Sequence, residues 1–179
     1  MVRNIRLFLA VLLIAGLASA AIAQYEDDKP SKIGIGLINF LPMDSDLKDL
    51  RSMWMGPVID WHLSFDEEGR PDRLVSLGFI DSGEKYIKAS EEFATYTKIN
   101  RTPISENRSR YIGYGGGIHR LKLRTYGYDD GTFKPSVHAL YGQEFNDIYF
   151  AEIRVDLLPK WKDADWGGIS LNIGTRISL

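Results

Sequence analysis

His62 and Ser64 lie two positions apart and are the residues in the sequence that most resemble a catalytic pair, a histidine base beside a serine nucleophile. Residues at this spacing project from the same face of an extended strand, so an imidazole base and a serine hydroxyl can approach each other. A serine nucleophile also needs an acid that orients the base. The pair is therefore a weak candidate for a hydrolase site, and the favoured interpretation is two polar residues on the inner face of a strand.

Other chemical motifs are incomplete. Ser136 and His138 stand in the reverse order with no acid close by, and His119 has no serine at this spacing. The Asp44–Asp46 segment lacks the later ligands of a calcium loop. The glycine run at 113–117 lacks the Lys-Ser/Thr pair of a phosphate loop. The sequence thus predicts no metal site, no cofactor and no enzymatic activity.

The composition excludes several classes of protein. The chain has 179 residues, 22 basic and 24 acidic side chains, 12% aromatic residues and no cysteine. A nucleic-acid binder would carry a basic excess. The absence of cysteine excludes disulfides, thiolate metal sites and a cysteine nucleophile.

The N-terminus has the layout of a secretory signal peptide. Arg3 and Arg6 form a positive region, an apolar stretch spans 7–18, and Ala21-Ile22-Ala23 supplies a small-x-small cleavage site. The apolar stretch is shorter than the ~20 residues of a spanning helix. We therefore expect residues 1–23 to be cleaved near Ala23, residues 24–31 to form a periplasmic segment, and residues 32–179 to form the folded domain.

Period-two alternation of apolar and polar residues runs through this domain and predicts strands. It is clearest over 149–157 and 166–179, where a helix would mix the two sets that alternation separates. Six further segments read as strands: 32–41, 53–65, 74–81, 93–102, 110–124 and 132–145. Eight strands follow, joined by short links that alternate with longer ones such as 43–52, 82–92, 126–131 and 159–165. Pro57 predicts a bulge, or a ladder that starts at Val58.

The polar faces indicate which side of the sheet is enclosed. They carry many glycines. On the solvent face of a soluble sheet, these glycines would weaken the strands, and no stabilising contact would compensate for the loss. In a narrow membrane barrel, glycines can instead make room for long charged neighbours facing a polar lumen, while the apolar face contacts lipid. The predicted lumen charge network is Asp60, Lys98, Glu144, Glu152, Arg154, Asp156 and Arg176. On the 93–102 segment, this places Lys98 inward and Phe93, Thr95, Thr97 and Ile99 outward.

The predicted fold is therefore all-β, an eight-stranded antiparallel up-and-down transmembrane β-barrel. The chain resembles the small bacterial outer-membrane barrels of the OmpA/OmpX-like and OmpW-like groups. The segments that support this resemblance are the strands at 111–117 and 150–154 and the final segment 168–179. This resemblance implies that the last strand is an assembly signal, with Leu171, Ile173, Ile177 and Leu179 on one face. Leu179 stands where these families usually end in an aromatic residue.

The expected function is that of a non-enzymatic outer-membrane barrel with a plugged polar lumen and a structural, adhesive or small apolar ligand-binding role. The resemblance implies outer-membrane lipids, lipopolysaccharide and the barrel-assembly machinery as partners, no nucleic acid, and a monomer. Two alternatives remain open. One is a lipid-modifying hydrolase with a rim site, similar to lipid A deacylases, that uses His62 and Ser64. The other is a secreted soluble lipocalin-like barrel.

Overall fold

A computed structural model describes residues 33–67, 69–83 and 87–177, so the predicted signal peptide and the 24–31 segment lie outside the described residues. The elements are β1 (Ile33–Pro42), α2 (Ser45–Leu50), β2 (Trp54–Phe65), β3 (Pro71–Asp81), β4 (Lys88–Ser105), β5 (Arg108–Thr125), β6 (Tyr128–Phe145), β7 (Tyr149–Leu157) and β8 (Gly168–Ile177). Among the described residues, no helix is long and apolar enough to cross a membrane.

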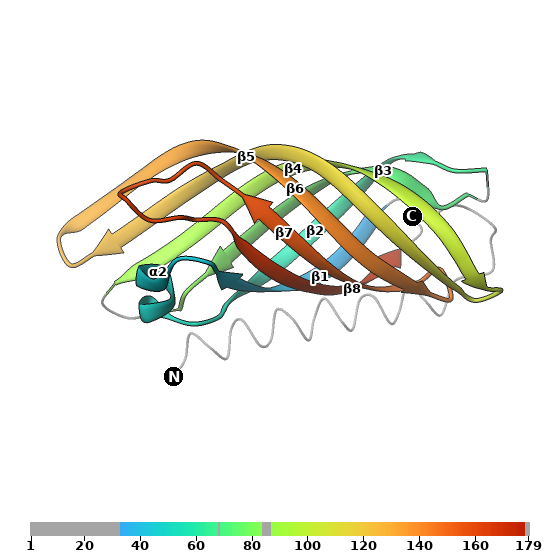
Figure 1. The fold of residues 1–179 in the computed structure, drawn as a ribbon, viewed down its shortest axis with the longest axis horizontal. Helices are drawn as coiled ribbons and strands as arrows, with labels where there is room; N and C mark the ends of the chain where they lie inside the picture. The colour runs from blue at the N-terminus through green and yellow to red at the C-terminus, as the bar shows by residue number, and fades with distance from the viewer. Residues whose placement is uncertain (1–32, 68, 84–86, 178–179) are drawn as a thin grey trace.

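The strands form one closed antiparallel barrel in chain order (Figure 1). Closure occurs between the first and last strands, since Leu37 of β1 pairs with Pro57 of β2 on one side and with Ile173 of β8 on the other. Every strand therefore has a neighbour on both sides, and the barrel has no open seam. The predicted eight-stranded up-and-down fold is confirmed.

The connections define two ends of the barrel. At the turn end, residues 66–70, 106–107 and 146–148 join the strands; at the loop end, the connections are 43–53, 82–87, 126–127 and 158–167. The prediction of a longer 126–131 loop is wrong. The β5–β6 connection is only a two-residue turn, in which Gly127 has φ +80°, a conformation that glycine adopts without steric cost.

Strands β4, β5 and β6 each span 18 residues and are longer than predicted. Their β5–β6 hairpin projects beyond the other strands at the loop end (Figure 1). The apolar alternation stops where charged side chains begin, yet the ladder continues beyond the predicted ends through pairs such as Ser90 with Lys122 and Arg124 with Asp129. Backbone pairing does not require an apolar face, which is why the sequence pattern ended too early.

Pro57 causes neither predicted effect. The ladder to β1 includes Pro57, and the β2–β3 register is the same at Met55 as at Val58. The ring fits because its side of the strand faces outward. The register shifts instead lie further along, between His62 and Phe65, where β2 approaches the turn end.

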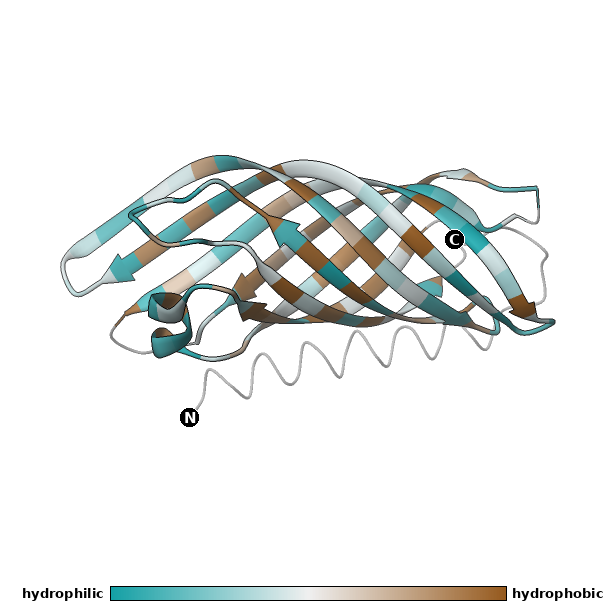
Figure 2. Ribbon diagram, viewed as in Figure 1, coloured by the Kyte–Doolittle hydropathy of each residue, from teal (hydrophilic) through white to brown (hydrophobic). Residues whose placement is uncertain are grey.

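The two faces of the sheet differ as a membrane barrel requires. Large apolar side chains are exposed on the outside, among them Ile59, Leu77, Ile112, Ile118, Val137, Ile153 and Ile173. Polar residues alternate with them along the strands, as the alternating bands of Figure 2 show. These polar side chains are buried inside the barrel. A soluble barrel would have the opposite arrangement.

Strand β4 is the exception to the predicted faces. Glu91, Phe93, Thr95, Thr97 and Ile99 are buried inside the barrel. The prediction that Lys98 belongs to the lumen network is therefore wrong, since Lys98 alternates with this set and is directly paired with the outward-facing Arg73 and Tyr114. Phe93 faces inward because its partner across the ladder is Gly78, where even a Cβ would lie 2.2 Å from the Phe93 ring.

Candidate functional site: the polar lumen

The lumen is narrow enough for aromatic rings to pack directly on glycines of the neighbouring strand. Tyr111 faces Gly142, and Phe150 faces Gly174, with an added Cβ at these glycines falling 2.3 and 2.4 Å from the rings. The glycines were expected to make room for arginines. Gly142 and Gly174 instead accommodate aromatic rings, a cross-strand pairing that covers the exposed backbone of the glycine, whereas Gly34 faces the charged residue Asp60.

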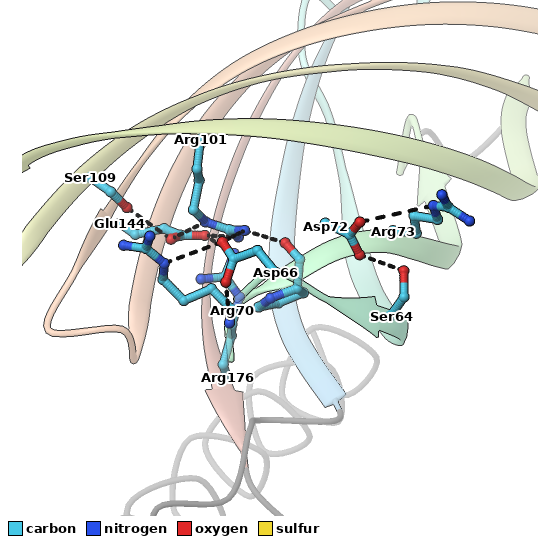
Figure 3. A network of polar contacts seen from close by, with 10 residues as sticks. Ser64, Asp66, Arg70, Asp72, Arg73, Arg101, Ser109, Glu144 and Arg176 are labelled. Atoms are coloured by element: carbon cyan, nitrogen blue, oxygen red, sulfur yellow. Dashed lines mark hydrogen bonds and ion pairs between the residues drawn. The ribbon is translucent and has the colours of Figure 1, made fainter. Parts of the chain in front are cut away.

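At the turn end, one carboxylate holds two arginines from different strands (Figure 3). Arg101 of β4 donates from Nε to Glu144 Oε2 at 2.6 Å and from Nη2 to Oε1 at 2.5 Å. Arg176 of β8 contacts the same carboxylate, and the Ser109 hydroxyl donates to it at 3.0 Å. All four side chains point into the lumen at this end, and Arg101, Glu144, Ser109 and Arg176 are almost fully buried there.

This cluster also ties down the connection between β2 and β3. The Arg101 guanidinium donates to the Pro71 carbonyl and lies 3.8 Å from the Asp66 carboxylate. Asp66 in turn accepts from the Arg70 backbone N–H at 2.9 Å and pairs with its side chain at 3.5 Å. Arg101 thus links a strand, a turn and the central carboxylate.

Glu152 is a hydrogen-bond acceptor in the middle of the lumen. The Tyr111 hydroxyl and the Asn172 amide both donate to its carboxylate at 2.8 Å. Asp60 is buried on the opposite wall, 6% exposed, with its Cβ 3.2 Å from the position that a Cβ on Gly34 would occupy.

A second charged cluster lies toward the loop end. Arg154 donates to Asp156 at 2.6 Å and to the Thr95 hydroxyl at 3.2 Å. His119 contacts Glu91 through Nδ1, and its Nε2 lies 4.0 Å from Asp156. Phe93 packs against this cluster: its ring stacks on the His119 ring at 5.4 Å, and the Arg154 guanidinium lies over it, also at 5.4 Å.

The loop end is closed by an apolar cap. Leu47 of α2 packs with Phe40, Trp54 and Trp166 in one buried cluster. Trp54 contacts both Phe40 and Trp166, with ring centroids 5.7 and 5.9 Å apart. The sequence analysis did not identify this cap, because its members come from two loops and two strand ends.

Asp44 joins the two loops of the cap. Its carboxylate accepts the backbone N–H of Asp46, at the start of α2, and that of Asp165, in the 158–167 loop, both at 2.9 Å. The Asp165 N–H and the further backbone donors lower the pKa of the Asp44 carboxyl. The cap is therefore held by a charge-assisted contact as well as by packing.

Six of the seven predicted lumen charges are buried inside the barrel: Asp60, Glu144, Glu152, Arg154, Asp156 and Arg176. The structure assembles them with residues that the sequence analysis missed, namely Arg101, Glu91, His119 and Tyr111. The extra members from β4 were missed because its faces were inverted. Glu91 and Arg101 share a face with Phe93, so assigning the Phe93 face of β4 to the lumen would have identified both residues.

The weak catalytic candidates have other partners. The Ser64 hydroxyl donates to the Asp72 carboxylate (Figure 3), and a register shift separates Ser64 from His62. His62 is buried and lies edge-on to Phe65 at 6.2 Å. In the part of the chain that the structure describes, no group of three or more His, Asp or Glu residues is placed to hold a metal ion.

Several solved barrels share this architecture. Neisserial surface protein A aligns with a TM-score of 0.61 at 10% identity, covering 82% of this chain and 96% of its own. The N-terminal barrel domain of Pseudomonas aeruginosa OprF gives 0.54 at 11%, covering 83% and 98%. Ail, the attachment invasion locus protein of Yersinia pestis, gives 0.50 at 20%, covering 82% and 97%.

The chain has the fold of the small outer-membrane barrels. At these identities the likeness concerns the fold alone. No protein-family model matches the sequence, and no curated protein matches it either.

Proposed function

We propose that this protein is a non-enzymatic integral outer-membrane barrel with a plugged lumen and a structural or adhesive role at its loop end. The observation that carries the proposal is the apolar outer face combined with a charged, packed interior. On β5, the outward residues between Arg110 and Arg120 are Ile112, Tyr114, Gly116 and Ile118.

The spacing of these two arginines fits a bilayer. Ten residues of a strand span ~34 Å at about 3.4 Å per residue. A tilt of about 40° reduces this to ~26 Å along the barrel axis, close to the ~25 Å apolar band of outer-membrane barrels. The short turns at one end and the larger loops at the other favour a periplasmic turn end.

The alternatives are less well supported. A rim hydrolase would need the Ser64 proton to pass to His62, whereas the Ser64 hydroxyl donates to Asp72. A lipocalin-like barrel would need an apolar interior, whereas Glu144, Glu152 and Arg154 are buried in this one. A role in binding a small apolar ligand inside the barrel is disfavoured for the same reason.

The loop end presents the surface that would meet other molecules. Tyr126 is fully exposed at the tip of the β5–β6 hairpin, and Phe133 is 68% exposed on its outward side. If the role is adhesive, Tyr126→Ser should reduce attachment of cells that display the protein, without changing its level in the membrane. Glu106→Gln, in the β4–β5 turn at the opposite end, is the matched control.

Fractionation and heat-modifiable migration test the proposal. A folded membrane barrel in the outer-membrane fraction should migrate differently on SDS gels before and after boiling. The proposal fails if the protein is recovered from the periplasm in soluble form with unchanged migration. Partnership with lipopolysaccharide and the barrel-assembly machinery, and a monomeric state, belong to the same proposal.

A further inference from the structure

The 158–167 loop between β7 and β8 contains a strained tight turn. Trp161 and Ala164 exchange two backbone hydrogen bonds, with N···O distances of 3.0 and 3.2 Å. The two residues between them, Lys162 and Asp163, have φ values of +53° and +64°. Glycine and asparagine adopt such a turn readily, whereas a lysine side chain gives it no local support. Contacts outside the turn must therefore hold Lys162 in this conformation.

Those contacts lie on the β5–β6 hairpin. The Lys162 ammonium lies 2.6 Å from the Asp130 carboxylate and also donates to the Tyr128 hydroxyl. That hydroxyl donates in turn to Asp130 at 2.7 Å, so the three side chains form a closed triangle, named here the latch. The latch is accessible to solvent, because the Lys162 and Asp130 side chains are 33% and 39% exposed.

No ladder supplements the latch. The pairing of β6 with β7 ends at Val137, so the part of β6 that carries Tyr128 and Asp130 has no ladder on its β7 side. Among the described residues, no backbone hydrogen bond joins the 158–167 loop to this part of β6. The loop is thus attached to the hairpin by side chains, and it can move away without breaking the sheet.

The other side of the same turn reaches into the apolar cap. The Trp161 carbonyl accepts the indole N–H of Trp166 at 3.2 Å, and the two rings lie 5.3 Å apart. Ala164 is 9% exposed and belongs to the same buried cluster as Trp54 and Trp166. The turn therefore connects a solvent-accessible ion pair on the hairpin with the apolar contacts that close the loop end.

We propose that residues 158–164 form a lid over the loop end, which the latch holds shut and which opens as ionic strength rises. Salt screens exposed charges, since the Debye length falls from about 30 Å at 0.01 M to about 3 Å at 1 M. Without the latch, the strained turn is released and the lid swings about Asp165, whose backbone N–H stays bound to Asp44. Opening presents the apolar cap beside the exposed Tyr126. This inference rests on the proposed function, which assigns the loop end to contact with other molecules.

Thiol labelling measures the lid, because the chain has no cysteine of its own. Ala164→Cys places one thiol on the buried side of the lid, and its reaction rate with N-ethylmaleimide is measured on protein refolded into lipid vesicles. With the latch intact, the rate should rise between about 0.01 and 1 M NaCl. Lys162→Met should raise the low-salt rate by about fivefold, the scale of an exposed ion pair, and should remove the salt dependence. Asp130→Asn should have the same two effects.

Two controls separate the latch from other effects. Lys160→Met removes an exposed lysine of the same loop and should leave the labelling rate unchanged. Ser109→Cys places a thiol in the buried turn-end cluster, where labelling should stay equally slow with and without the latch, because the barrel itself remains folded. The double variant Asp130→Lys and Lys162→Asp exchanges the two charges and should restore slow labelling of the Ala164→Cys thiol at low salt.

The inference is overturned if Lys162→Met labels no faster than Lys160→Met, or if the exchange of charges does not slow the reaction. It is also overturned if loss of the latch accelerates Ser109→Cys as much as Ala164→Cys, because Lys162 would then support the whole barrel. The proposed function fails by a different result, recovery of a soluble protein whose migration boiling does not change. The two failures are therefore distinguishable.

Discussion

Arg101 and Glu144 form a two-pronged ion pair on the inner wall of the barrel, although they come from β4 and β6 and β5 lies between them. Both side chains are almost fully buried, at 4% and 1% exposed. The same carboxylate also binds Arg176 of β8. One acidic side chain therefore joins three strands, β4, β6 and β8, at the turn end of the barrel.

Glu144→Gln should strongly destabilise the barrel. It removes the carboxylate that both Arg101 and Arg176 contact, and leaves Arg101 with the Asp66 carboxylate 3.8 Å away. Breaking a buried ion pair in this way costs roughly 3–5 kcal/mol. Urea unfolding of the protein refolded in lipid vesicles measures the loss. Glu106→Gln, in the exposed β4–β5 turn, should leave the unfolding free energy unchanged. Equal stability of the two variants would show that the pair contributes little.

Ile153→Arg tests which face meets lipid. Ile153 is 53% exposed on the outward side of β7. An arginine there should cost ~2–4 kcal/mol if the position lies near the bilayer midplane. Ile104→Arg provides the control, because Ile104 lies at the turn end of β4 next to Ser105, the last residue of that strand. The assignment of faces would be inverted if the lumen change Asp156→Leu were harmful while Ile153→Arg was tolerated.

The refolded protein should conduct no ions. Its lumen is closed by the Arg101–Glu144–Arg176 cluster at the turn end and by the Trp54 and Trp166 cap at the loop end. Planar-bilayer recording checks this, with a refolded porin as the positive control. Stable, ion-selective current steps from the unmodified protein would contradict a plugged lumen and favour a channel function.

The cap should loosen in acid through Asp44. Its carboxyl pKa is lowered from the ordinary value of 3.8, so its contribution is present above that value and is lost as the pH falls through the lowered folded-state pKa. Tryptophan emission should shift in this range as Trp54 and Trp166 are exposed to water. Asp44→Asn should lack this component of the shift, whereas Asp49→Asn, exposed in the same loop, should retain it. If the tryptophan emission of the wild type and of Asp44→Asn changed identically with pH, Asp44 would not be the group that loosens the cap.

Deletion of residues 177–179 should prevent assembly. Ile177 is the direct partner of Ile33 in the β1–β8 ladder, so the deletion shortens the seam that closes the barrel. Unpaired backbone groups in lipid each cost several kcal/mol. We expect degradation in the periplasm, detected by immunoblotting of cell fractions. Normal membrane levels would argue against an essential role of this end, including the predicted signal residues Ile177 and Leu179.

The alternation of residue types predicted all eight strands and, for seven of them, which face is enclosed. This was possible because covalent geometry places successive side chains on opposite faces, so the sequence order alone separates the two sets. Ile169, Leu171 and Ile173 alternate with Ser170, Asn172 and Gly174, and the structure keeps these two sets apart.

The orientation of β4 depends on contacts with the neighbouring strands and does not follow from its own residues. Both of its alternating sets contain apolar and polar residues, so the pattern alone was ambiguous. The choice depends on the neighbouring strand, where Gly78 leaves space for the Phe93 ring. That choice turned Lys98 outward and brought Glu91 inward.

The partners within the lumen also depended on the tertiary structure. Arg101 and Glu144 are 43 residues apart in the sequence and meet because of the register of β4 on β5 and of β5 on β6. A register shifted by one residue would turn either side chain to the opposite face. Register is fixed by contacts between strands across the closed barrel, and the alternation within a single strand contains no information about it.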